Sequence, residues 1–334
     1  MLAVALALLA GCARSPPDGP SAGGSTQSGD SRGDTRGSRR TPPASAALDA
    51  EDHIITSGGA RIAVNLDPAL AQDPADVLHW VQDGADVVSA YYGRFPVPEL
   101  RVIVSPRRGA AVNSGTTYGG RRIEIHLDPR ARPESLARDW ILVHEMFHLG
   151  FPTLPDDYEY LQEGLSDYLE PLARARAGNL TEEAVWREFV RGMPKGLPDE
   201  RDGGLDGTHA WGRVYWGGCF FWLLVDLDIR ERSGHTKSLD DAIRAIVDAG
   251  GTGDHEWTLE RMIEVGDAAT GTGSFARLHD RFGPAAVDPE LDELWRRLGV
   301  VMDGGRVRFD EQAPLAEIRR SMTEPAESEA ASTR

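Results

Sequence analysis

The stretch from residue 123 to residue 150 changes its hydrophobic period from two residues to about 3.6. Apolar and polar side chains alternate over residues 123–127, as expected of a strand with one buried face, and a helical pattern follows from residue 134 to Gly150. Before this switch, strand patterns occupy 54–66 and 100–104, with one helical pattern over 77–92 between them. After it, almost everything is typical of helix or loop. This segregation predicts an α+β fold, a small mixed β-sheet followed by a mainly helical domain.

Composition limits the classes of protein that fit this chain. With 334 residues, 40% of them hydrophobic, the chain can bury a substantial core as one large domain or two smaller ones. Its 36 basic and 53 acidic residues give a formal net charge of −17, which offers no basic surface for nucleic acid. The two cysteines, Cys12 and Cys219, cannot make a disulfide framework. We therefore expect a globular protein that does not bind nucleic acid.

The N-terminus begins with eleven apolar or small residues before Cys12, a run too short to span a bilayer. The sequence LAGC at 9–12 resembles the bacterial lipobox, in which a signal peptide is cleaved before the cysteine and a lipid is attached to its sulfur. This resemblance implies a lipoprotein signal peptide over 1–12 and a protein anchored to a membrane through Cys12. The domain would then lie outside the cytoplasm, in the bacterial cell envelope. The alternative is an ordinary buried helix.

Composition also predicts the remaining boundaries. Residues 13–50 are dominated by Ser, Gly, Pro, Arg and Thr, so they cannot repay the entropy of ordering and are expected to form a flexible tether. A single folded domain is predicted over 51–315, β-rich over 51–130 and helical over 131–315. The polar, small residues of 316–334 are expected to form a disordered tail.

The helix predicted over 134–150 carries the sequence HEMFH. His144 and His148 lie four residues apart, so both imidazoles are on one helical face and can share a zinc ion. Glu145 lies about 100° further round the helix, where its carboxylate can act on a water at the metal. Composition alone would produce this spacing only about 0.02 times in such a chain. The alternative is a pair of histidines that are solvated or satisfied within the core.

A catalytic zinc site uses three protein ligands and leaves a position for water. Glu163, in the downstream segment YLQEGLSDYLE, is the candidate third ligand if that segment is a helix packed on the first. Asp167, one turn later, can then bind the outer nitrogen of a ligand histidine. The alternative for Glu163 is a solvent-facing carboxylate. A purely structural zinc site is disfavoured, because such sites usually have four Cys or His ligands.

These two motifs resemble those of the gluzincin zinc metallopeptidases, and among them the glycyl aminopeptidase and aminopeptidase-N-like families. Weaker similarity is found at 215–218, 227–230 and 238–241, and the resemblance covers roughly 52–312. It implies a thermolysin-like zinc peptidase domain in which Tyr215 donates a hydrogen bond to the oxyanion formed during hydrolysis. His209 is a second candidate donor. Alternatively, Tyr215 is part of the core or of a pocket wall.

Aminopeptidases of these families have a Gly-rich strand that ends in an acid, which captures the free amine of the substrate. The corresponding stretch here is predicted at 118–124, where Gly119 and Gly120 are followed by Arg121 and Arg122. These four residues are predicted to bind substrate. Either arginine in the cleft would repel an ammonium group, which argues against exopeptidase action from the N-terminus and is compatible with endopeptidase action. The strand can bind an extended peptide at the sheet edge through its backbone.

The sequence thus predicts a membrane-tethered, zinc-dependent peptidase that acts on a peptide or protein substrate. Glu145 is expected to activate the water at the metal. The alternative is a binding or scaffold lipoprotein that keeps the peptidase fold without catalysis. Cleavage preference, endo- or exopeptidase action and oligomeric state are left open.

Overall fold

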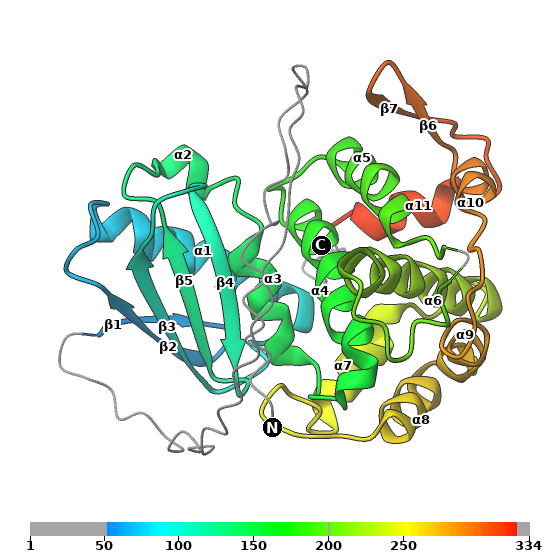
Figure 1. The fold of residues 1–334 in the computed structure, drawn as a ribbon, viewed down its shortest axis with the longest axis horizontal. Coiled ribbons are helices and arrows are strands. Elements are labelled where there is room, and N and C mark those ends of the chain that lie inside the picture. The colour runs from blue at the N-terminus through cyan, green and yellow to red at the C-terminus, as the bar shows by residue number, and fades with distance from the viewer. Residues whose placement is uncertain (1–51, 200, 326–334) are drawn as a thin grey trace, which may run out of the picture.

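The computed structural model describes residues 52–199 and 201–325. Its first half is built on a five-stranded mixed sheet with the order β1-β2-β3-β5-β4 (Figure 1). Strands β1 and β4 pair antiparallel with their neighbours, whereas β3 pairs parallel with both β2 and β5. The strands are β1 (His53–Ser57), β2 (Ala60–Leu66), β3 (Glu99–Pro106), β4 (Val112–Tyr118) and β5 (Arg122–Leu127).

Helix α1 (Pro74–Tyr92) lies between β2 and β3 in the chain, whereas α2 (Pro133–Leu136) and α3 (Ile141–Phe147) follow β5, and α1 and α3 pack on the sheet. Helix α1 begins where the Asp73 side chain accepts a hydrogen bond from the backbone of Ala75, and it ends at Gly93 in the left-handed conformation. The alternation over residues 123–127 is confirmed, because the apolar side chains of β5 are buried and the polar ones are half-exposed.

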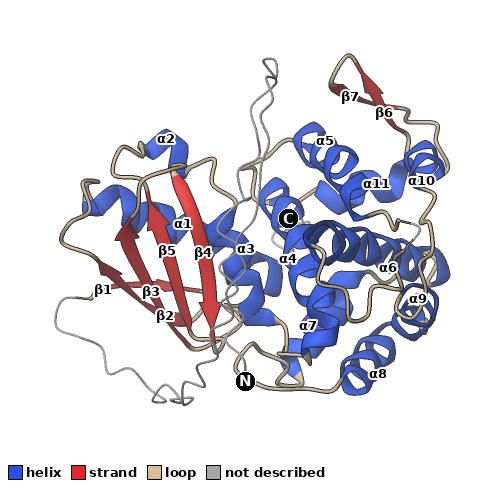
Figure 2. Cartoon of the chain, in the orientation of Figure 1, coloured by secondary structure: helices blue, strands red, loops and turns tan. Residues whose placement is uncertain are grey.

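The second half is almost entirely helical, as Figure 2 shows. The α+β prediction is therefore confirmed. Within the described residues, no helix combines the length and the apolar character that crossing a membrane requires. The elements from residue 148 to residue 298 are η1 (His148–Gly150), η2 (Asp156–Tyr158), α4 (Glu159–Arg176), α5 (Glu182–Gly192), η3 (Met193–Gly196), η4 (Arg213–Gly217), α6 (Gly218–Arg232), α7 (Leu239–Asp248), α8 (Leu259–Thr270), α9 (Ser274–Phe282) and α10 (Leu291–Leu298).

The single long helix predicted over 134–150 is wrong. The chain forms two short helices, α2 and α3, and a 3-10 turn, η1, with a break at 137–140. The break is stabilised by Asp139, whose carboxylate accepts hydrogen bonds from the backbone N–H groups of Ile141 and Leu142, at 3.0 Å each. Such a carboxylate satisfies donors that the first turn of a helix leaves open, so Asp139 starts a new helix at α3.

The tail predicted over 316–334 is wrong in its first part, because helix α11 (Ala316–Thr323) packs on the domain. Ile318 and Met322 are buried, and Arg319 is fully buried between carboxylates of Glu182 and Glu311. This helix is preceded by a hairpin of β6 (Val300–Asp303) and β7 (Arg306–Phe309), which the helical prediction over 131–315 did not contain. The predicted signal peptide at 1–12 and tether at 13–50 lie outside the described residues.

Candidate metal centre

The candidate site is built around α3, which lies between strand β4 and helix α4 (Figure 1). His144 and Glu145 are both buried, although they point in different directions around the helix. The His144 ring faces α4, where Glu163 and Asp167 lie, whereas the Glu145 carboxylate faces β4, where it contacts Thr117. The five-residue motif therefore presents histidines to one neighbouring element and its carboxylate to another.

The three predicted metal ligands come together. The Nε2 atoms of His144 and His148 lie 3.2 Å and 3.5 Å from Oε2 of Glu163. One donor atom from each of the three residues lies within 4.8 Å of the others, and in the described part of the chain they form the only such group of His, Cys, Asp or Glu residues. The donor set is therefore two imidazoles and one carboxylate.

The outer nitrogen of each histidine faces the same helix. Nδ1 of His144 lies 3.0 Å from Oδ1 of Asp167, and Nδ1 of His148 lies 3.3 Å from Oγ of Ser166. Contacts of this kind hold a ligand ring in one orientation and one tautomer, with Nε2 turned towards the metal. Helix α4 thus provides a ligand and both groups that orient the histidines.

Charge is balanced within the cluster. Burial disfavours the charged form of Glu163, but the neighbouring His148 and His144 outweigh it and hold the pKa of that carboxyl well below its usual range. Burial also opposes the charged form of His144, but Asp167 and Glu163 outweigh it and raise the pKa of the imidazole. The acid is therefore ionised at neutral pH, as a metal ligand must be.

The geometry fits zinc. Zinc bonds to imidazole nitrogen and carboxylate oxygen are about 2.0–2.2 Å long, so neighbouring ligand atoms in a tetrahedral site lie about 3.3–3.6 Å apart. The separations of 3.2 Å and 3.5 Å between the histidine nitrogens and the Glu163 oxygen are close to this range. Three protein ligands leave the fourth position for water or substrate.

Two helices approach each other closely where Glu163 is held. A methyl group added to Gly164 on α4 would lie 2.2 Å from backbone atoms of Gly218 on α6, which no ordinary contact allows. The two glycines therefore let the backbones of α4 and α6 touch.

Tyr215 lies on η4, a short π-helix, and its ring stacks beside that of His144. The ring centroids are 6.3 Å apart with an interplanar angle of 20°. The ring of Trp211 in turn stacks on that of Tyr215, with the two ring centroids 5.7 Å apart. A π-turn inside a helix is common at functional sites. The structure thus places the Tyr215 ring beside that of His144, and its role as hydrogen-bond donor stays a prediction.

The stretch at 118–124 is not the edge strand beside the metal ligands, so that prediction is wrong by one strand. The edge strand is β4, whereas β5 is an inner strand paired on both sides. Gly119 and Gly120 form the turn between them in the left-handed conformation. Arg121 forms an ion pair with Asp254 at 2.7 Å. Arg122 contacts its strand neighbour Glu124 and lies over the ring of Tyr118.

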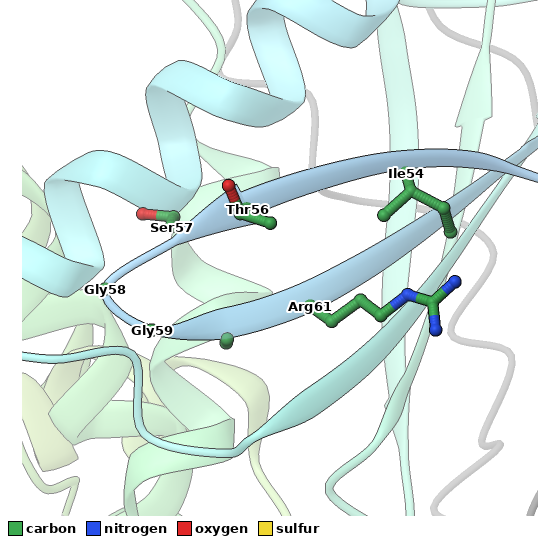
Figure 3. Close-up of a pocket in the computed structure, with 7 residues that line it drawn as sticks. Ile54, Thr56, Ser57, Gly58, Gly59 and Arg61 are labelled. Atoms are coloured by element: carbon green, nitrogen blue, oxygen red, sulfur yellow. The ribbon is translucent and has the colours of Figure 1, made fainter.

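A hollow of about 400 Å³ lies over the hairpin of β1 and β2 (Figure 3). It shares no residue with the His–His–Glu cluster, and β1 is at the opposite edge of the sheet from β4. The lining residues of the hollow are Ile54, Thr56, Ser57, Gly58, Gly59, Ala60 and Arg61.

Sequence reasoning missed three residues of the site. Ser166 could have been found, because it follows Glu163 by three positions and must share its face of a helix. Gly115 and Thr117 had no sequence signal, since their role depends on how closely β4 approaches α3. Thr117 lies 2.7 Å from the Glu145 carboxylate, and a methyl group added to Gly115 would lie 2.5 Å from Cγ of Glu145.

No protein-family model matches the sequence, and no curated protein matches it either. Solved structures do resemble the fold. An aminopeptidase N family protein from Idiomarina loihiensis has a TM-score of 0.56 at 14% identity, over 75% of this chain and 49% of that one.

The M1 zinc metallopeptidase from Deinococcus radiodurans has a TM-score of 0.47 at 15% identity, over 72% of this chain and 53% of that one. A variant of it bound to a Tyr-Ser-Ala substrate has a TM-score of 0.49 at 16% identity, over 72% and 53% of the two chains. The chain spans about half the length of these proteins. At this identity the likeness concerns the fold alone: residues of this chain adopt the fold of part of an aminopeptidase N family protein.

Proposed function

We propose that the protein is a zinc-dependent peptidase that hydrolyses peptide bonds. One observation carries the proposal: the donor atoms of His144, His148 and Glu163 converge, and the residue that follows His144 on α3 is a buried acid, Glu145, that is not one of them. A binding site for zinc alone needs no such fourth group. A hydrolase needs it as a base for the attacking water.

Each of the chain's own groups has a role in this chemistry. Zinc, when bound, would act as a Lewis acid towards water and the scissile carbonyl. Glu145 takes the proton of the attacking water and passes it to the leaving amine. Tyr215, whose ring lies beside that of His144, donates a hydrogen bond to the developing oxyanion.

The substrate is proposed to be a peptide or protein in extended form. Strand β4 pairs only with β5 in the described sheet, so its other edge is available to a peptide strand. Such pairing depends on backbone groups and sets no strong side-chain preference. Arg121 is held by Asp254, so the structure gives no support to a role of this arginine in substrate binding, and the position of the cleaved bond in the peptide is left open.

Cleavage of a peptide library by residues 52–334, with and without a chelator, tests this function. We expect metal-dependent cleavage that Glu145→Gln abolishes while the bound zinc is retained. Glu124→Gln is the matched control, since this half-exposed acid of β5 is not part of the cluster. Absence of metal-dependent cleavage of any peptide would overturn the proposal. Unchanged biological activity of Glu145→Gln would support the scaffold alternative instead.

We also propose that the peptidase is anchored to a membrane of the bacterial cell envelope through a lipid on Cys12. The support is the LAGC sequence at 9–12. Mass spectrometry of the membrane fraction is expected to find a modified Cys12 at the N-terminus, and Cys12→Ser should move the protein to the soluble fraction. Full-length protein that keeps Met1 in the soluble fraction would contradict this anchor.

A further inference from the structure

Strand β4 touches the proposed catalytic base directly. The hydroxyl Oγ1 of Thr117 lies 2.7 Å from Oε2 of Glu145 and donates a hydrogen bond to it. The same hydroxyl lies 2.9 Å from the backbone oxygen of Glu145. A hydrogen bond to an ionised carboxylate is short and strong, and a β-branched threonine holds few rotamers, so this contact restricts where the carboxylate can lie.

The contact depends on a close approach of the strand to the helix. Gly115, two residues earlier, lies on the same face of β4 as Thr117. A methyl group added to it would lie 2.5 Å from Cγ of Glu145, 2.8 Å from Ile141 and 2.9 Å from Ile125. Any larger residue would therefore push β4 away from α3 and draw the Thr117 hydroxyl away from the carboxylate.

We propose that Thr117 is a positioning residue for Glu145, and that Gly115 sets the distance at which it acts. The inference rests on the proposed function and adds a specific device to it. Strand β4, whose unpaired edge is proposed to bind the peptide, also holds Glu145, the base that activates the attacking water. One rigid strand thereby positions both the substrate and the base. Positioning both on one element keeps the geometry of the reacting complex within fractions of an ångström.

Thr117→Val removes the hydroxyl and keeps the shape of the side chain. We expect kcat to fall roughly 10- to 100-fold, as loss of one hydrogen bond to a charged group would cause, with KM and zinc content nearly unchanged. Thr117→Ser should recover most of the loss because it restores the donor. Thr236→Val is the control, since its hydroxyl bonds to the backbone of Ser233 in the loop after α6.

A crystal structure of each variant gives a readout that needs no activity. In Thr117→Val the Glu145 carboxylate is expected to leave its position, and in Thr117→Ser to keep it. An unmoved carboxylate in Thr117→Val, or a kcat equal to that of Thr236→Val, would overturn this inference while the proposed peptidase function stands. If the unaltered protein cleaves no peptide, the peptidase function fails, and the carboxylate positions still decide whether Thr117 holds Glu145.

Discussion

Nδ1 of His144 lies 3.0 Å from Oδ1 of Asp167, on the side of the ring away from Glu163. Asp167 follows Glu163 by one turn of α4, so a single helical face bears a metal ligand and the group that orients another ligand. The imidazole is thereby held between two carboxylates. Its orientation is set before any metal binds.

Asp167→Ala removes the group that orients His144. We expect the affinity for zinc to fall about 10- to 100-fold, because partners of this kind fix the tautomer and the ring direction. Competition with a chromophoric chelator measures it. Asp157→Ala, at an exposed acid of η2, is the control and should bind zinc normally. Equal affinities of the two variants would show that Asp167 has no such role.

Tyr215→Phe removes only the hydroxyl and keeps the ring that stacks beside His144. If that hydroxyl donates to the oxyanion, kcat should fall about 100- to 1,000-fold while KM and zinc content change little. Steady-state kinetics with a cleaved peptide from the library gives both constants. Tyr158→Phe, at a ring that packs on His279, controls for loss of a tyrosine hydroxyl. A kcat close to that of the unaltered protein would assign Tyr215 to the pocket wall.

Gly164→Ala places a methyl group 2.2 Å from the backbone of Gly218. Because backbone cannot yield as a flexible side chain does, α4 and α6 must separate, and we expect a loss of about 1–3 kcal/mol in the free energy of unfolding. Urea titration measures this loss. Gly203→Ala is the matched control, since a methyl group there meets nothing within 4 Å. Similar stabilities of the two variants would contradict a tight crossing of these helices.

Asp139 makes the stability of the protein depend on pH. Burial raises the pKa of its carboxyl to about 6; the Ile141 and Leu142 N–H groups and Arg174 act against this rise, and Glu170 adds to it. The folded state therefore keeps a proton that the unfolded state releases near pH 4, and this contribution to stability is lost as pH rises from about 4 to 6.

Asp139→Asn keeps an acceptor for the start of α3 but cannot ionise. Between pH 4.5 and pH 7 the unaltered protein should lose about 2 kcal/mol more of its free energy of unfolding than Asp139→Asn does. Urea titrations at both pH values measure this. Asp156→Asn, at an exposed acid, serves as the control. An identical pH dependence for both variants would show that Asp139 titrates normally.

Local spacing was enough to predict the relative positions of His144, Glu145 and His148. Helical geometry repeats every 3.6 residues, so residues four apart share a face wherever the helix lies. The same reasoning predicted the buried face of β5 and the succession of sheet and helices. These features depend on residues that are close together in the sequence, so the sequence alone determines them.

Packing between distant segments decided the rest. Glu163 reaches the histidines because α4 packs on α3, and Thr117 reaches Glu145 because Gly115 lets β4 approach α3. Arg121 turned from the predicted site to Asp254 for the same kind of reason. The period of a sequence gives the face on which a side chain lies, but the distance between two elements depends on all the side chains packed between them. Only the tertiary structure contains that distance.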